Sequence, residues 1–220
     1  AFSIAFSGDA DLVITGELGE QFFLWEWVTA LVGAALEIDP FNQPNVTEAK
    51  EATSALLAEW NGVLPEFAAD AIDGAVEIFG AGSDLTVALR NFINEIPAGG
   101  YVAVMAYLDR SGDRDLAKLR EIIARKSNRP VTFGWGPRFL HSTGQFHKGG
   151  QQNGAFLQIT GVTNGDVAIP GQNFGFKTLI MAQALGDLRA LAKRKYPLLR
   201  LHLSDRSAGI AQLLKAAEAL

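Results

Sequence analysis

The chain alternates between short apolar segments, which predict β-strands, and amphipathic segments, which predict helices. The clearest strand is the uninterrupted apolar run Tyr-Val-Ala-Val-Met-Ala-Tyr at residues 101–107, a pattern typical of a strand that is buried on both faces of a sheet. Strands that are separated by helices of about 10–15 residues favour a parallel sheet. The sequence therefore predicts an α/β fold with a mainly parallel sheet and helices on both faces.

The predicted elements follow one another along the whole chain, with no internal repeat and no linker that would divide it into independent domains. Asn164 and Gly165 predict a hairpin turn between the strand before them and a short strand at 167–169. Helix 20–36 has apolar residues on most of its faces, so we expect it to be largely buried. The other strands are predicted at 75–79, 131–133, 155–160 and 198–203, and the other helices at 45–57, 85–93, 115–126, 179–191 and 208–220.

Length and composition exclude several classes of protein. A chain of 220 residues can bury a sizeable core without disulfides or structural metals. It contains no cysteine, which excludes disulfides, thiolate metal sites and a cysteine nucleophile. Its most apolar run, residues 22–36, is interrupted by Glu26 and is shorter than the ~20 residues that a membrane span requires. We therefore expect no membrane-spanning segment.

Charge is unevenly distributed along the sequence. Residues 1–49 contain eight acids and no base, whereas residues 110–148 contain nine bases and three acids. A local positive region of this kind suits a small anion such as a phosphate ester. It is too mixed for nucleic-acid binding, which calls for a strongly basic face. The alternative is a solvated helix face around Arg114, Lys118, Arg125 and Lys126.

The first candidate site lies at the helix predicted to start near residue 45. Asn45 and Glu48 form a capping-box pattern, and a helix N-terminus attracts anions through its free N–H groups and its dipole. Lys50 lies one turn further along and could reach back to a ligand, with Gln43 just outside the cap. The alternative is a surface lysine that pairs with Glu48 or Glu51.

The second candidate site is the segment 134–154, in which six of 21 residues are glycine and no helix or strand period is visible. Long irregular segments are uncommon unless they are functional or disordered, and its aromatic residues argue against disorder. The alternative is a structural crossover. The spacing of the two histidines matches no local zinc motif, so we expect no metal. The residues that could contact a ligand are His141, His147, Arg138, Ser142, Thr143, Gln145, Lys148 and Gly149.

Three further features carry weaker signals. Gly80 and Gly82 form a Gly-x-Gly pattern between a strand and a helix, but without the third glycine of a dinucleotide site, so a tight turn is the better interpretation. Glu26, between two tryptophans, would have a raised pKa if it were buried and could then act as a base. The alternative is that it hydrogen-bonds the loop at 39–43. His202, inside an apolar strand, is interpreted as a core histidine.

Two long motifs resemble a known enzyme family. The segment Phe-Asn-Gln-Pro-Asn-Val-Thr-Glu-Ala-Lys at 41–50 resembles the Asn-Pro-Phe-Asp-Gln-Pro-x-Val-x-x-x-Lys motif of bacterial glucose-6-phosphate isomerases. The segment 136–150, Gly-Pro-Arg-Phe-Leu-His-Ser-Thr-Gly-Gln-Phe-His-Lys-Gly-Gly, is similar to a segment near the C-terminus of bifunctional transaldolase/glucose-6-phosphate isomerases. The resemblance extends over residues 1–220, which correspond to the C-terminal portion of the isomerase half.

This resemblance implies a sugar-isomerase (SIS) fold and interconversion of glucose 6-phosphate and fructose 6-phosphate through an enediol, without metal or organic cofactor. Lys50 matches the motif lysine, which the family uses near the ring oxygen and the C1 and C2 oxygens. Gln43 matches the glutamine beside the substrate. Either His141 or His147 could serve in ring opening. The family also implies a cytoplasmic protein and a homodimer.

The sequence departs from the family in ways that bear on activity. Asp39 and Asn42 exchange the acid and the amide of the usual motif. The Glu-Ser-x-Gly-Lys segment with the catalytic glutamate and the Ser/Thr-rich phosphate loop are both absent from the 220 residues. Because proton transfer needs a positioned base, we expect that this chain needs an upstream isomerase and transaldolase part, and that alone it is inactive unless Glu26 substitutes. The alternative is a non-catalytic module that binds sugar phosphates or another subunit.

Overall fold

The structure is a computed structural model that describes residues 3–42 and 44–220, apart from the side chain of Ser142. The chain forms two compact units, Ala1–Asn42 and Gln43–Leu220. The sequence predicted no linker between independent domains, whereas the structure separates these two compact units. The boundary falls in the Asp-Pro-Phe-Asn-Gln-Pro segment, in which Pro40 lies between two helices and Pro44 begins the second of them. No Gly/Ser-rich linker marks this boundary in the sequence.

The N-terminal unit contains a pair of two-residue parallel strands, β1 (Ile4–Ala5) and β2 (Leu12–Val13), and the helix α1 (Leu18–Ala35). A capping box between Glu17 and Glu20 starts the helix. The expected burial of this helix is wrong, because Gly33, under the ring of Pro40, is its one buried residue. Phe22 and Phe23 are each 64% exposed, and Glu26 is exposed as well.

The C-terminal unit is built on a six-stranded sheet in the order β3-β4-β8-β7-β5-β6. Strands β8, β7, β5 and β6 are parallel, and β4 pairs antiparallel with both β3 and β8. This arrangement confirms the α/β fold with a mainly parallel sheet. The strand bounds are β3 Ala71–Asp73, β4 Val76–Phe79, β5 Tyr101–Ala106, β6 Val131–Trp135, β7 Gly154–Gly161 and β8 Leu198–Leu203.

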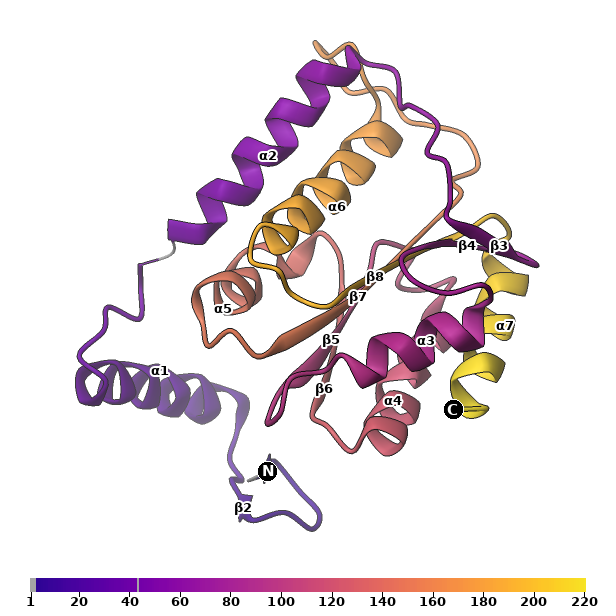
Figure 1. Ribbon diagram of the computed structural model, residues 1–220. Coiled ribbons are helices and arrows are strands. Elements are labelled where there is room, and N and C mark those ends of the chain that lie inside the picture. The colour runs from indigo at the N-terminus through magenta and orange to yellow at the C-terminus, as the bar shows by residue number, and fades with distance from the viewer. Residues whose placement is uncertain (1–2, 43) are drawn as a thin grey trace. The chain divides into compact units, whose positions relative to one another are not determined.

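Helices cover both faces of this sheet, as Figure 1 shows. One layer contains α3 (Leu85–Asn94), α4 (Leu119–Ser127) and α7 (Arg206–Glu218), together with the 3₁₀ turn η1 (Arg114–Lys118). The other layer contains α5 (Ser142–Gly149) and α6 (Phe176–Ala192). The 3₁₀ turn η2 (Arg138–Leu140) comes directly before α5 in the chain. Helix α2 (Pro44–Trp60) packs against α6 and against α5.

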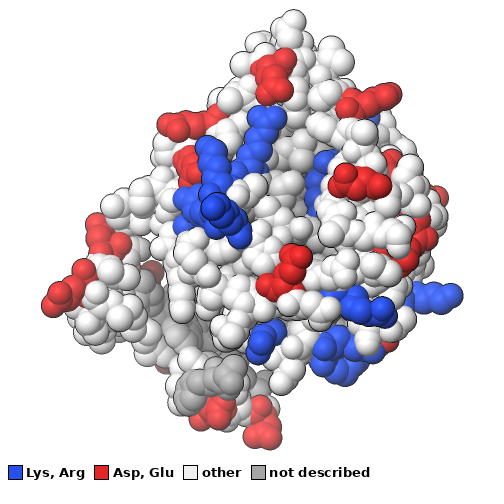
Figure 2. All heavy atoms as spheres, in the orientation of Figure 1, with Lys and Arg blue, Asp and Glu red and all other residues white. Residues whose placement is uncertain are grey.

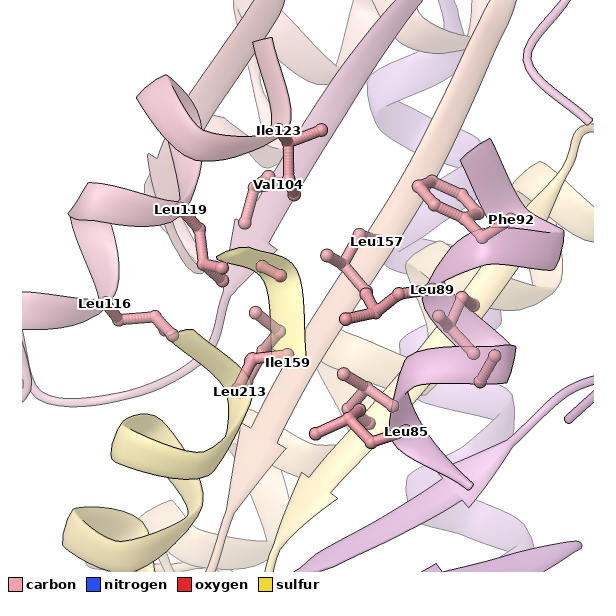
Figure 3. Packing of buried hydrophobic residues seen from close by; sticks show 14 of the residues in the cluster. Leu85, Leu89, Phe92, Val104, Leu116, Leu119, Ile123, Leu157, Ile159 and Leu213 are labelled. Atoms are coloured by element: carbon pink, nitrogen blue, oxygen red, sulfur yellow. The ribbon is translucent and has the colours of Figure 1, made fainter. Parts of the chain in front are cut away.

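The strands place alternate residues on opposite faces, and the two faces differ in chemistry. Toward α3, α4 and α7 they present an apolar core, drawn in Figure 3, in which Leu157 and Ile159 of β7 meet Leu89 of α3 and Leu213 of α7. The intervening residues of β7 and β8 face the other layer and include Gln158, Thr160, Arg200 and His202. The second face therefore combines apolar clusters with buried polar groups.

Three local predictions differ from the structure. No hairpin follows Asn164, because residues 162–175 run as an irregular segment that pairs only through the isolated bridge Ala168–Gly175 before α6 begins. The hairpin in the fold is β3–β4 instead. The segment 134–154 is not irregular but contains η2 and α5. Asn45 does not cap α2, because the helix already begins at Pro44.

Candidate functional site

The first site that the geometry suggests is a groove of about 340 Å³ between α2, α6 and the turn that follows η2. Lys50 of α2 and His141, which immediately precedes α5, both line it, although they come from the two separate sequence motifs. We call it the Lys50 groove. The remaining lining residues are Val46, Ala49, Thr53, Ser54, Leu57, Leu140, Leu179 and Gln183.

Two close contacts hold the walls of this groove together. The backbone N–H of Asn45 donates to Oε1 of Gln145, and Nε2 of Gln145 donates to Oδ1 of Asn45, both at 2.8 Å. This reciprocal pair fixes the start of α2 against α5 and thereby places His141 beside α2. On the opposite wall, a Cβ at Gly186 would lie 2.8 Å from Oγ1 of Thr53, so the glycine allows α6 to approach α2 closely.

Lys50 is exposed and free to meet a ligand. Within the described residues no ion pair to Lys50 is formed. The alternative pairing with Glu48 is not realised, because Arg194 holds that carboxylate with contacts of 2.7 and 3.0 Å. Arg194 also lowers the pKa of Glu48 by hydrogen bonding to it. Lys50 thus lines the groove and forms no ion pair with a described residue.

His147 does not share this groove. Its ring is 3% exposed and lies 5.0 Å from the ring of Phe156 and 6.0 Å from that of Tyr101, measured between centroids. Burial, with a contribution from the charge of Lys148, lowers its pKa to about 4. A histidine in these surroundings is neutral at physiological pH and is part of the core, so the geometry does not favour the predicted catalytic role.

Lys148 is likewise an interior residue. Its Nζ lies 2.6 Å from Oδ1 of Asp187 of α6, and both side chains are fully buried. Burial raises the pKa of Asp187, against the opposing effect of the Lys148 ammonium. This ion pair joins α5 to α6 beneath the surface, and it leaves Lys148 unable to reach a ligand in the groove.

The other predicted ligand contacts fall into three groups. Arg138 and Thr143 are exposed, and neither lines the groove. Gln145 forms the pair with Asn45, and a Cβ at Gly149 would lie 2.6 Å from both members of that pair, so these two residues act in packing. The side chain of Ser142 and the whole of Gln43 lie outside the described residues.

Sequence reasoning missed the polar residues that accompany Lys50. Thr53 and Ser54 follow it by three and four positions on α2 and line the groove with it. Residues with this spacing share one face of a helix, so the pattern was available in the sequence. Gln183 of α6 could not be found in this way, because only the packing of α6 on α2 brings it to the groove.

The weaker sequence signals have structural explanations. Gly82 has φ +159°, and a Cβ there would lie 2.7 Å from the backbone of Ala88. Asp84 caps α3 by accepting a hydrogen bond of 2.9 Å from the Val87 N–H. The Gly-x-Gly segment is therefore a tight turn. Nδ1 of His202 lies 2.8 Å from Oγ1 of Thr160. Among the hydrogen bonds of residues 3–42 and 44–220, none joins Glu26 to the loop at 39–42.

No group of three or more acidic or histidine side chains in the described part of the chain is arranged to hold a metal ion. Within the same residues, no helix has the length and apolarity that crossing a membrane requires. On the face drawn in Figure 2, acidic and basic side chains are interspersed. This face is therefore not uniformly positive.

Comparisons with known proteins find little that is similar to this chain. No protein-family model and no curated protein matches the sequence. Among solved structures, the chain is similar to a hypothetical protein, TT0462 from Thermus thermophilus, with 17% sequence identity and a TM-score of 0.48. The alignment covers 60% of this chain and 36% of that protein.

Proposed function

We propose that the chain supplies part of the active site of an aldose–ketose isomerase that interconverts glucose 6-phosphate and fructose 6-phosphate. The observation that carries this proposal is the meeting of Lys50 and His141 in one groove. Each belongs to one of the two motifs that resemble the isomerase family. Long-range packing of α5 on α2 brings these motifs together, as a shared substrate site requires.

The groups in the groove suit the chemistry of this reaction. Moving a proton between C1 and C2 develops negative charge on the oxygen atoms of the enediol. The Lys50 ammonium, which forms no ion pair with a described residue, would stabilise that charge. His141 can exchange a proton with the ring oxygen when the sugar opens. The hydroxyl of Ser54 and the amide of Gln183 can hydrogen-bond sugar hydroxyls, whereas the Thr53 hydroxyl already donates to the carbonyl of Ala49.

The groove lacks a carboxylate base among the described residues that line it. Proton transfer between C1 and C2 needs such a base, and Glu26 belongs to the separate N-terminal unit. We therefore infer that the glutamate implied by the family resemblance comes from another part of the complete enzyme. The same missing base favours the second candidate function, a module that binds a sugar phosphate without transforming it.

Ligand binding tests the role of the groove. We expect 6-phosphogluconate, an open-chain sugar-phosphate mimic, to raise the thermal midpoint of the chain. At ~100 times its dissociation constant the ligand adds about 2.7 kcal/mol to the free energy of unfolding, which corresponds to about 5 °C or more. Lys50→Ala should abolish this shift. The matched control is Lys215→Ala on α7, an exposed lysine on the opposite side of the sheet.

Two results would contradict the proposal: an unchanged midpoint at saturating millimolar ligand, or a shift that Lys50→Ala preserves. Turnover then separates the two candidate functions. In the complete enzyme, Lys50→Ala should lower the rate of isomerisation with little change in thermal midpoint. If the chain is only a binding module, the same substitution leaves turnover intact while it weakens sugar-phosphate binding.

A further inference from the structure

A second cavity, of about 390 Å³, lies toward the carboxyl ends of the parallel strands and shares no lining residue with the Lys50 groove. In open α/β sheets, ligands bind outside the carboxyl ends of the strands where the strand order reverses. Here the reversal lies between β5 and β7, since β6 is on one side of β5 and β7 is on the other. Tyr107, directly after β5, and Thr160 and Gly161, at the end of β7, line this cavity.

Two neighbouring rows of register partners in the sheet contribute polar residues to its floor. Glu77, His202 and Thr160 are register partners on β4, β8 and β7, and Phe79, Arg200 and Gln158 are register partners one step away. Glu77, Thr160, Arg200 and His202 line the cavity. Because these positions are fixed by paired strands, their side chains are held in place before any ligand arrives.

Arg200 is a buried cation that forms no ion pair in the described residues, although the charge of Glu77 favours its charged form. It is 6% exposed, and its Nε has no hydrogen-bond partner. No carboxylate of the described residues forms an ion pair with it. Its guanidinium carbon lies 3.9 Å from the ring centre of Phe79 and 5.1 Å from that of Phe67.

Burial lowers the pKa of Arg200 to about 10, which still leaves it charged at neutral pH. A buried charge without a partner is costly, and an N–H without an acceptor adds to that cost. An oxyanion in the cavity would satisfy both. The two phenyl rings provide cation–π contacts and supply no hydrogen-bond acceptor for the N–H groups.

Tyr107 lines the same cavity and carries a hydroxyl on which the charge of Asp187 acts. Its side chain is 5% exposed, and its hydroxyl has no hydrogen-bond partner. Beside it, Thr160 and His202 form a pair, and burial lowers the pKa of His202 to about 4, so this pair is neutral at physiological pH. Met181 and Ile180 of α6 add an apolar wall.

We propose that this cavity is a second binding site, for a small organic oxyanion such as a carboxylate or a phosphate monoester, whose oxygens accept hydrogen bonds from Arg200 and Tyr107. The body of the ligand lies against Met181 and Phe67. Glu66, Glu77 and Lys177 also line the cavity. The two carboxylates offset the charges of Lys177 and Arg200 and accept hydrogen bonds from hydroxyl groups, so the ligand carries a single anionic group together with hydroxyls.

The Nε–H signal of Arg200 in an arginine-selective ¹H–¹⁵N NMR spectrum reports directly on the proposed contact. The signal is assigned by its loss in Arg200→Lys. Titration with inorganic phosphate and, separately, with lactate should move this signal downfield in a saturable manner, and whichever probe binds more tightly identifies a phosphate or a carboxylate as the preferred group. Sodium chloride at matched ionic strength is the control and should leave it unchanged.

Tyr107→Phe should weaken the tighter of the two probes several-fold while the Arg200 signal stays in place. Lys50→Ala should leave the titration unchanged, and Arg200→Met should leave the Lys50-dependent effect of 6-phosphogluconate unchanged, so the two sites succeed or fail independently. The proposal is overturned if neither probe gives a saturable movement of the Arg200 signal in the unsubstituted chain, or if chloride moves it equally.

Discussion

At the scale of single residues, the most demanding feature is the buried ion pair between Lys148 and Asp187. Both side chains are fully buried, and Oδ2 of Asp187 has no hydrogen-bond partner within the described part of the chain. Removing one partner of such a pair leaves an isolated charge in the interior, whereas replacing both with apolar groups removes the desolvation cost as well.

We expect Asp187→Asn to lower the free energy of unfolding by about 3–5 kcal/mol, measured by urea denaturation. The double variant Lys148→Met/Asp187→Leu should lose much less than that. The exposed pair Arg125–Glu218, at 2.6 Å, is the control, and Arg125→Ala should change stability by about 0.5 kcal/mol or less. A double variant that is as unstable as Asp187→Asn would show that the pair does more than neutralise its own charges.

At the scale of elements, the packing of α2 on α6 depends on one glycine. A Cβ at Gly186 would lie 2.8 Å from Oγ1 and 2.9 Å from the backbone nitrogen of Thr53. Since the backbone of α2 is one of these neighbours, the contact cannot be relieved by moving a side chain alone. The two helices would have to separate, and the Lys50 groove between them would change shape.

Gly186→Ala should therefore destabilise the C-terminal unit by about 1–3 kcal/mol through overpacking, although alanine favours helices over glycine by about 1 kcal/mol. The matched control is Gly19→Ala in α1, where a Cβ has no neighbour within 4 Å, and which should be neutral or stabilising. Thermal midpoints of both variants give the sign. A stabilising Gly186→Ala would mean that α2 shifts without cost.

Local patterns in the sequence predicted most elements of the fold but not those that depend on distant contacts. β8 at 198–203 follows from its apolar run, whereas α5 was missed, because glycine weakens the segment 142–149 as a helix and the pairing of Gln145 with Asn45 fixes it. The helical type of α1 was predicted correctly and its burial was not. Apolar residues on all faces of a helix show that the helix is hydrophobic. They do not show whether another surface is present to bury it.

The candidate site divides in the same way. A motif pointed to Lys50. The orientation of α5 then determines that His141 joins Lys50 in the groove and that His147 does not. Arg200 and His202 alternate with leucines on β8, and Gln158 and Thr160 alternate with apolar residues on β7. This period of two could have revealed a polar sheet face. That Arg200 lacks a partner could not have been read from the sequence.

At the scale of the whole molecule, the two units differ in how they are stabilised. The three buried apolar clusters consist of residues from Leu56 onward, so the C-terminal unit contains its own core. In the N-terminal unit, Leu18, Phe22 and Leu31 of α1 are more than 60% exposed. Cooperative unfolding of the chain should therefore report mainly on the C-terminal unit.

The acid stability of that unit should depend on its buried histidines. His147 has a folded-state pKa of about 4 and an ordinary pKa of 6.5, so the unfolded chain binds more protons between these values. The free energy of unfolding therefore falls as pH drops from 6.5 toward 4, by up to about 1.4 kcal/mol per pH unit for this residue. His147→Leu should flatten the pH dependence of denaturant unfolding in this window.

The exposed His141 serves as the control, and His141→Gln should leave the slope unchanged. His202 should add to the same trend, because burial lowers its pKa as well. Hydrogen-bonded or ion-paired carboxylates such as Glu48, whose pKa is lowered, lose their contribution only at more acidic pH. An unaltered slope in His147→Leu would show that another group controls acid unfolding.

The position of β8 in the sheet also determines when folding can be completed. This strand lies between β4 and β7 and joins them in the sheet order, yet it follows β4 by more than half the length of the chain. During synthesis the β3–β4 hairpin lacks this neighbour until residues 198–203 emerge, and sheets with such distant pairings form slowly. Until then Val76 and Ile78 lack their partners on β8, so the nascent chain is most exposed to aggregation before residues 198–203 emerge.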